Sequence, residues 1–185
     1  MAIEEKDLLV FQVSRLPEEG LDFDEKFSPE WLVNIPEYAG ESATRIKGGI
    51  MVRGTIMLEG ESLFVRGRVF TELSTFCTRC GESMVYPLEG KVEMALLPGP
   101  PPDLPSEMEI TAEDATAEYY HGDEVDLAGF FQEAVALQVP IQSLCREDCK
   151  GLCPRCGANL NYETCNCEEE EGDPRLAPLR NLKIE

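Results

Sequence analysis

Eight cysteines, which occur as four close pairs, are the residues of this sequence best suited to chemistry. Three pairs share one stretch near the end of the chain, LCREDCKGLCPRCGANLNYETCNC, and the fourth lies upstream in CTRC. The pairs are Cys77 and Cys80, Cys145 and Cys149, Cys153 and Cys156, and Cys165 and Cys167. In a reducing compartment, clustered cysteines hold metal or do redox chemistry more often than they form structural disulfides. We therefore expect thiolates that bind a metal ion.

The spacing of the pairs suits tetrahedral zinc, which is held by four thiolates in many structural sites. Two cysteines separated by two residues and followed by glycine, as in CPRCG, can direct both sulfur atoms at one ion. The set with the shortest connecting loop closes at little entropic cost and would bind the first zinc ion. This first set is Cys153, Cys156, Cys165 and Cys167. The set left over, which would bind a second ion and join a strand turn to the tail, is Cys77, Cys80, Cys145 and Cys149.

Other interpretations of the cysteines stay open. Four thiolates also suit an iron–sulfur cluster, although the spacings match neither common ferredoxin pattern. A thiol–disulfide enzyme is a second alternative, but its CxxC opens a helix after a βα unit, whereas CPRC follows a loop-rich segment. Cys77 and Cys80 could also be small buried hydrophobic residues. Zinc remains the leading interpretation.

Alternating apolar and polar residues predict the strands that carry the first pair. One run extends from Ala43 to Leu58, a turn follows at Gly60, and the return run extends from Leu63 to Ser74. A third run, residues 84–97, has the same period of two. Three successive strands with short links form an antiparallel meander, and the CTRC pair lies in its second turn. A further short strand is expected at residues 8–13.

One helix should cover this meander. Asp126 is a plausible N-cap, and Pro140 ends the helical pattern. The expected apolar stripe is Leu127, Phe130, Phe131, Ala134, Val135 and Leu137. The predicted fold class is therefore α+β: an antiparallel β-meander packed by one main helix, with a C-terminal cysteine-rich zinc module. We expect residues 1–142 to form the sheet-plus-helix domain and residues 143–185 to form the cysteine-rich module and tail, with a proline-rich loop or linker at 98–106.

The charge of the chain restricts its partners. Its formal net charge is −20, yet residues 43–92 carry seven basic and five acidic side chains. Such an acidic protein is not a general nucleic-acid binder, because phosphate contacts normally require a dominant basic face. A local basic patch could still contact RNA, and its candidates are Arg45, Lys47, Arg53, Arg66, Arg68, Arg79 and Lys91. The acidic remainder suits a basic protein partner.

The sequence does not indicate an enzyme or a membrane protein. Its single histidine, His121, lies among acidic residues, and no glycine-rich phosphate loop is found. The N-terminus MAIEEKDLLVF lacks the basic start of a signal peptide, and no segment approaches roughly 18 uninterrupted apolar residues. We expect a cytoplasmic protein with no membrane partner and no small-molecule substrate.

The order of several motifs resembles the bacterial YceD family of large-subunit (23S) ribosomal RNA accumulation proteins. The motifs are CTRCGE, EVDLAGFFQEAVALQVP, CKGLCPRCGANLN, CNC and DPRLAPLRNL. The resemblance implies a non-enzymatic ribosome-biogenesis factor that supports 23S rRNA accumulation. It would bind a ribosomal precursor RNA or a basic ribosomal or assembly protein. Some relatives lack the terminal cysteines, which implies that zinc stabilises the tail while the meander and helix carry the shared task.

Two rivals to this function stay open. One is a cytosolic redox- or metal-responsive protein whose thiols oxidise or exchange metal as the signal. The other is a protein-interaction scaffold that makes no contact with RNA. Metal analysis after anaerobic purification distinguishes a structural zinc module from the responsive thiol protein. Crosslinking that recovers only proteins and no RNA indicates the interaction scaffold.

Overall fold

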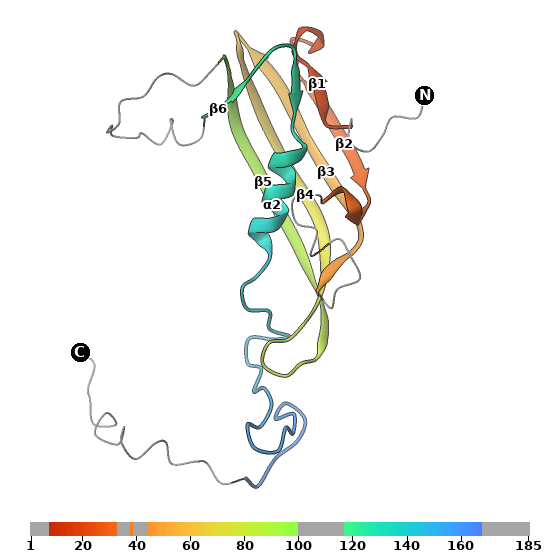
Figure 1. Ribbon diagram of the computed structural model, residues 1–185, viewed down its shortest axis with the longest axis vertical. Helices are drawn as coiled ribbons and strands as arrows, with labels where there is room; N and C mark the ends of the chain where they lie inside the picture. Colours follow the sequence, from red (N-terminus) through yellow and green to blue (C-terminus); the bar gives the residue numbers. More distant parts are fainter. Residues whose placement is uncertain (1–7, 33–37, 39–43, 100–116, 168–185) are drawn as a thin grey trace, which may run out of the picture.

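Three long strands form the centre of the structure, a computed structural model that describes residues 8–32, 38, 44–99 and 117–167. They are β3 (Arg45–Glu59), β4 (Ser62–Phe76) and β5 (Ser83–Pro98), each antiparallel to the next (Figure 1). Their apolar side chains alternate, so that Ile56, Val65 and Leu96 are buried on one face. The predicted meander, with turns at Gly60 and at the CTRC pair, is confirmed.

Two strands extend this meander to a five-stranded sheet of order β2-β3-β4-β5-β6. Strand β2 (Leu21–Phe27) is antiparallel to β3, and the short β6 (Ala117–Tyr120) is parallel to β5. Neither strand was predicted. The expected strand at 8–13 appears as β1 (Val10–Gln12), but it pairs with β7 (Glu124–Asp126) in a separate two-stranded sheet. Two 3-10 helices, η2 (Val13–Arg15) and η3 (Pro29–Trp31), lie before and after β2 in the sequence.

Helix α2 (Ala128–Gln138) covers one face of the sheet and leaves the other face open (Figure 1). It ends before Pro140 as predicted. Its N-cap residue is Leu127 and not the predicted Asp126, whose Oδ1 instead accepts a 2.8 Å hydrogen bond from the N–H of Ala128, the first residue of the helix. The predicted apolar stripe is partly wrong. Leu137 is 75% exposed, while the buried face includes Gln132, whose amide donates to the Trp31 carbonyl at 2.8 Å. Because successive side chains of a helix point about 100° apart, the position of α2 over the sheet decides which of them are buried. That position buries Gln132 and leaves Leu137 exposed.

Two glycines let the helix approach the sheet closely. A Cβ on Gly67 would lie 2.7 Å from Phe131 Cζ, and a Cβ on Gly90 would lie 2.8 Å from the Ala134 carbonyl oxygen. No carbon atom tolerates such distances without displacement. Phe131 therefore packs directly on the backbone of β4, where its ring also meets Phe23 edge to face at 5.9 Å.

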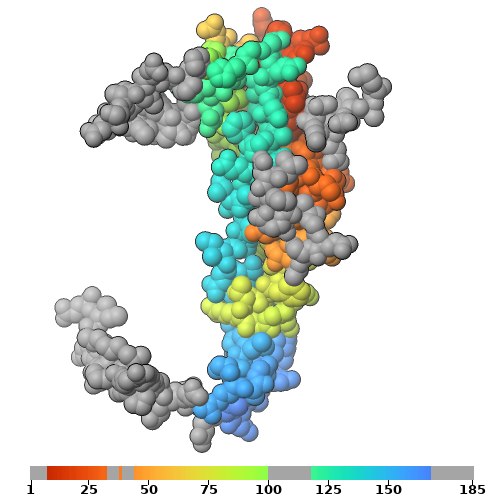
Figure 2. Space-filling model, viewed as in Figure 1, coloured from red at the N-terminus to blue at the C-terminus, as the bar shows by residue number. Residues whose placement is uncertain are grey.

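None of the helices in the described ranges combines the length and the apolarity that crossing a membrane requires. The chain after α2 leaves the sheet and reaches the turn between β4 and β5, where the last described residues form a small module (Figure 2). The proposed boundary between residues 142 and 143 stays a prediction. The expected loop at 98–106 lies mostly outside the described residues.

Candidate metal centres

Cys77 and Cys80 sit in a tight turn between β4 and β5. The Gly81 N–H donates to the Cys77 carbonyl at 2.8 Å, and the Cys77 N–H donates to the Glu82 carbonyl at 2.8 Å. Gly81 has a φ of +73°, a conformation that glycine adopts without the steric cost of a Cβ. In this turn the backbone N–H groups of Arg79 and Cys80 donate to the Cys77 sulfur, and that of Glu82 donates to the Cys80 sulfur.

Cys153 and Cys156 form a turn of the same construction. The Gly157 N–H donates to the Cys153 carbonyl at 2.9 Å, and the Cys153 N–H donates to the Ala158 carbonyl at 2.8 Å. Gly157 has a φ of +74°. The two CxxCG segments thus form equivalent turns, one between two strands of the sheet and one in the tail, and such turns suit cysteines that bind a metal ion.

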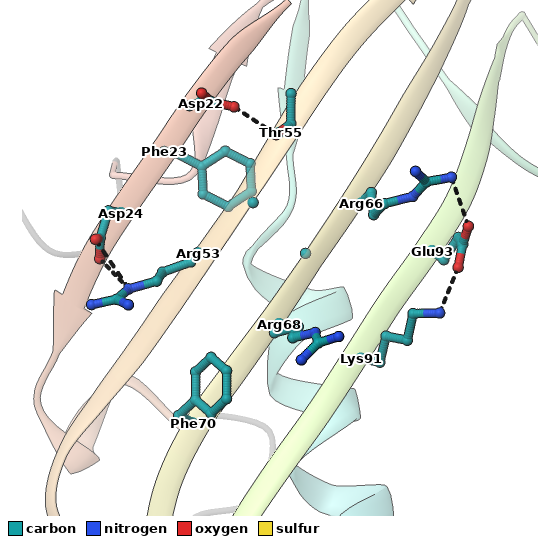
Figure 3. Close-up of a pocket in the computed structure, with 12 residues that line it drawn as sticks. Asp22, Phe23, Asp24, Arg53, Thr55, Arg66, Arg68, Phe70, Lys91 and Glu93 are labelled. Atoms are coloured by element: carbon teal, nitrogen blue, oxygen red, sulfur yellow. Dashed lines mark hydrogen bonds and ion pairs between the residues drawn. The ribbon is translucent and has the colours of Figure 1, made fainter.

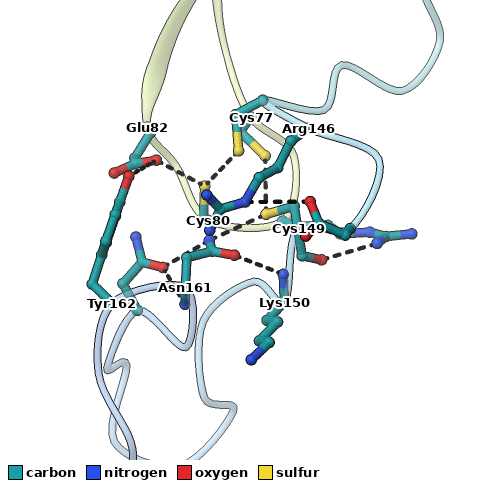
Figure 4. Close-up of polar contacts among 12 residues, drawn as sticks. Cys77, Cys80, Glu82, Arg146, Cys149, Lys150, Asn161 and Tyr162 are labelled. Carbon is teal, nitrogen blue, oxygen red and sulfur yellow. Dashed lines mark hydrogen bonds and ion pairs between the residues drawn. The ribbon is translucent and has the colours of Figure 1, made fainter.

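The first cluster joins the sheet turn to the chain that follows α2. We define it as Cys77, Cys80, Cys145 and Cys149, whose Sγ atoms all lie within 4.8 Å of one another. Cys77 Sγ lies 3.8 Å from Cys149 Sγ, and Cys80 Sγ lies 3.7 Å from Cys145 Sγ (Figure 4). A disulfide needs about 2.05 Å between sulfur atoms. Tetrahedral zinc with bonds of about 2.3 Å separates its thiolates by about 3.8 Å, so these distances fit a metal centre.

Backbone hydrogen bonds hold the later cysteines against the sheet turn. The Thr78 N–H donates to the Ser143 carbonyl at 2.8 Å, and the Leu152 N–H donates to the Arg79 carbonyl at 3.1 Å. The Arg79 guanidinium donates to the Cys149 carbonyl at 3.0 Å. Arg79, a predicted member of the basic patch, therefore lies at the first cluster and away from the other basic candidates.

The second cluster is local to the tail. It consists of Cys153, Cys156, Cys165 and Cys167, and its Sγ atoms also lie within 4.8 Å of one another. Cys153 is buried, Cys156 is exposed, and the other two are half-buried. In the first cluster, by contrast, three of the four cysteines are buried. The structure thus brings the eight cysteines together in the two predicted sets, while their occupation by metal stays a prediction.

Asn161 contacts the first cluster from within the second. It lies between Cys156 and Cys165, yet its Nδ2 donates to Cys149 Sγ at 3.3 Å and its Oδ1 accepts from the Lys150 N–H at 2.8 Å (Figure 4). The hydrogen bond from Asn161 is the main reason why the pKa of the Cys149 thiol is lowered. The sequence analysis missed this residue. An asparagine inside the ligand loop, in CGANLNYETC, was the available signal.

Each cluster favours one thiolate strongly. Backbone N–H groups of Cys156 and Arg155 lower the pKa of Cys153 to about 6. Burial acts to raise the pKa of Cys77, but backbone N–H groups of Cys145, Cys80 and Arg79 outweigh it and lower that pKa to about 6. Hydrogen bonding to Cys156, followed by burial, raises the pKa of Cys167 to about 12. A cation shared by the four sulfur atoms would stabilise the thiolate form of all of them.

Four of the predicted RNA-contact residues gather on the open face of the sheet. Register pairs Arg53 with Arg68 and Arg68 with Lys91, so three cations form a row across neighbouring strands, and Arg66 lies in the next row. They line an open hollow of about 710 Å³ (Figure 3). Carboxylates flank them: Arg53 pairs with Asp24, Arg68 with Glu89, and both Arg66 and Lys91 with Glu93.

The remaining basic candidates lie elsewhere. Arg45 and Lys47 are exposed at the other end of β3, on the far side of a register shift between Lys47 and Met51. The seven candidates therefore do not form one patch. His121 is exposed near the end of β6.

Comparison with known proteins gives a family and several relatives. A family model described as "Large ribosomal RNA subunit accumulation protein YceD" matches residues 65–183. The chain is 42% identical over 60 residues to the chloroplastic large ribosomal RNA subunit accumulation protein YCED homolog 1 of Arabidopsis thaliana, a match that covers 32% of this chain and 19% of that protein. The homologue of the same name in Zea mays is 33% identical over 60 residues, covering 32% of this chain and 20% of its own length.

A longer match is found in Mycobacterium tuberculosis. Its protein, named there as uncharacterized, is 32% identical over 157 residues, which cover 80% of this chain and 69% of the relative. The chain thus spans about a fifth of the length of the chloroplast relatives and about two thirds of the mycobacterial one. No solved structure matches the chain.

Proposed function

We propose that this chain, which belongs to the YceD family of large ribosomal RNA subunit accumulation proteins, supports the accumulation of large-subunit ribosomal RNA by binding a ribosomal precursor or an assembly partner. The observation that carries this proposal is the family match over residues 65–183, which includes most of β4, all of β5 and α2, and both cysteine clusters. The names of the two plant relatives agree with it. We expect the protein to act in the cytoplasm, where ribosomal subunits are assembled.

Depletion of the protein in its own cells tests this role. We expect the ratio of large-subunit to small-subunit ribosomal RNA to fall, and we expect re-expression of the full chain to restore it. An unchanged ratio after complete depletion contradicts the proposed function. Separate quantification of precursor and mature large-subunit RNA then distinguishes defective processing from loss of the finished RNA.

We propose a binding role and not an enzymatic one. A zinc ion held by four thiolates has no open coordination position for a substrate or for water, so it suits structure and not catalysis. The family is named for the amount of an RNA and not for a reaction. In this proposal the sheet with its helix carries the binding task that the family shares, and the cysteine-rich module is a structural addition.

Zinc is the metal that we propose for both clusters. The support is the set of four sulfur ligands in each cluster and the sulfur–sulfur distances of 3.7 and 3.8 Å in the first. Elemental analysis after anaerobic purification should find two zinc ions per chain and a colourless protein. Iron with acid-labile sulfide and a visible absorption band would instead identify an iron–sulfur protein.

The open face of the sheet is our candidate for the RNA contact. Arg53, Arg68 and Lys91 form its central row, and the exposed ring of Phe64 lies on the same face of β4, two positions before Arg66. Aromatic rings next to cations suit unpaired bases and their phosphates. The flanking carboxylates would limit binding to non-specific polyanions.

Substitution of the central cation tests this contact. Arg68→Gln should weaken crosslinking to precursor RNA in cells, whereas Arg15→Gln, at an exposed position in η2, should not. Equal RNA recovery from both variants would place the contact elsewhere on the protein. Recovery of ribosomal proteins without RNA would favour the interaction scaffold.

The exposure of Cys156 supports a second candidate function, a redox- or metal-responsive thiol protein. An accessible ligand can be oxidised or can pass its metal to a competitor more easily than a buried one. Mild peroxide should then release one zinc ion reversibly and change the ribosomal RNA ratio in cells. Stable retention of both ions under peroxide contradicts this function.

A further inference from the structure

The two cysteine clusters are in direct contact, and the proposed function gives this contact no role. Only three residues separate Cys149, the last cysteine of the first cluster, from Cys153, the first cysteine of the second. The loop between Cys156 and Cys165 folds back across this link. Its Leu160 N–H donates to the Gly151 carbonyl at 2.9 Å, and Leu152 forms a β-bridge with Asn159.

Asn161 is the member of this loop that reaches a sulfur atom of the other cluster. Its Nδ2 lies 3.3 Å from Cys149 Sγ, and its Oδ1 accepts from the Lys150 N–H at 2.8 Å. The second bond fixes the orientation of the amide, because the Lys150 N–H needs an acceptor and so places Nδ2 toward the sulfur. Asn159 Oδ1 braces the same residue by accepting from the Asn161 N–H at 3.1 Å and from Nδ2 at 2.9 Å.

A hydrogen bond of this kind changes how well a thiolate binds a metal. A donor next to a ligand holds it in position and stabilises its charged form, and the loss of such outer contacts typically costs about 10–100-fold in metal affinity. Asn161 makes this contact only while its loop is folded. A metal ion in the second cluster would close that loop at both ends, through Cys156 and Cys165.

We infer that the two clusters bind metal cooperatively and that Asn161 is the positioning residue that couples them. This inference rests on the proposed zinc sites. An ion in the second cluster orders the loop, the ordered loop presents Nδ2 to Cys149, and the first cluster then binds its own ion more tightly. Because coupling between two binding equilibria is reciprocal, an ion in the first cluster strengthens the second by the same factor.

The test is a zinc titration of the full chain under reducing conditions, in competition with a chromophoric chelator. Cys153→Ser removes the second site and leaves the first, and we expect the first site to bind zinc about 10-fold more weakly than in the unaltered chain. Cys77→Ser removes the first site and should weaken the second by a similar factor. Cobalt(II) in place of zinc gives a separate spectroscopic readout of tetrahedral thiolate ligation at each site.

Asn161→Ala decides whether this residue carries the coupling. We expect it to weaken the first site about 10-fold while the second site of the Cys77→Ser protein is unaffected by it. Combined with Cys153→Ser, it should cause no further loss at the first site. The matched control is Thr164→Ala, a substitution at an exposed position of the same loop, which should leave the first site unchanged.

The outcomes separate this inference from the proposal on which it rests. Two zinc ions that bind with affinities independent of each other overturn the coupling and leave the zinc sites intact. Additive losses from Asn161→Ala and Cys153→Ser overturn the role of Asn161. A chain that binds no zinc in either cluster overturns the zinc sites themselves.

Discussion

The Sγ atoms of Cys77 and Cys149 lie 3.8 Å apart, although the two residues are 72 positions apart in the sequence. Cys77 belongs to the turn after β4, and Cys149 belongs to the chain that has left α2. The first cluster is therefore a link between the sheet and the tail. The second cluster, whose four cysteines all lie within residues 153–167, joins two segments of the tail. Loss of the first cluster should therefore affect both the sheet turn and the tail, whereas loss of the second should affect the tail.

Removal of metal should destabilise the protein measurably. Structural zinc contributes its binding free energy to folding, so a strong chelator should lower the melting temperature by about 10 °C for a chain of this size. Differential scanning calorimetry before and after chelation measures this shift, and added zinc should reverse it. An unchanged melting temperature after confirmed metal loss would show that the clusters do not stabilise the fold.

Cys77→Ser and Cys153→Ser should differ in how far their effects spread. Cys77→Ser breaks the link to the sheet, so amide hydrogen exchange should rise both in the β4–β5 turn and in residues 143–152. Cys153→Ser should raise exchange only in the tail, because β4, β5 and α2 retain their own packing. Hydrogen–deuterium exchange with mass spectrometry compares the two, and an equal spread would contradict the distinction between the clusters.

Gly67→Ala should destabilise the protein by about 2 kcal/mol through overpacking. The added Cβ would lie 2.7 Å from Phe131 Cζ and 2.8 Å from the Arg53 carbonyl oxygen, and neither can withdraw without moving the helix or the sheet. Gly129→Ala is the matched control, since a Cβ there meets nothing within 4 Å. It lies within α2, and we expect it to stabilise the helix by about 0.5–1 kcal/mol. Urea unfolding measures both changes.

Asp126→Ala should destabilise the protein by about 1 kcal/mol, the usual effect of losing a side-chain hydrogen bond to a backbone N–H at the start of a helix. The substitution removes the 2.8 Å hydrogen bond from the Ala128 N–H at the first turn of α2. Glu124→Ala changes an exposed acidic residue of the same strand, β7, and should have little effect. Equal losses from both variants would indicate an effect of net charge instead of capping.

The central strands and the two sets of cysteines could be predicted because their signals are local. Alternation along β3, β4 and β5 indicates strands without any knowledge of their neighbours, and the nearest cysteines assemble at the lowest entropic cost. Strand β2 was missed because its outward positions are Asp22 and Asp24, next to a segment rich in proline and acid. Strand β6, the parallel partner of β5, is four residues long, which is too short for a clear alternation of apolar and polar side chains.

Contacts that depend on strand register could not be predicted from the sequence. Seven basic residues within fifty positions suggest one patch, but register pairs Arg66 with Glu93 across 27 positions and Arg53 with Asp24 across 29. Similarly, the stripe on α2 was misjudged at Leu137 because the face that a helix buries depends on where it lies over the sheet. Asn161 was missed because its role lies in a contact with the other cluster.

The first cluster also closes the chain on itself. Cys80 and Cys145 have their sulfur atoms 3.7 Å apart and are separated by 65 positions, so a shared ion would make the intervening backbone a ring. A single proteolytic cut anywhere inside that ring would leave two fragments that still travel together on a sizing column. They would separate only after the ion is withdrawn and the sheet is unfolded.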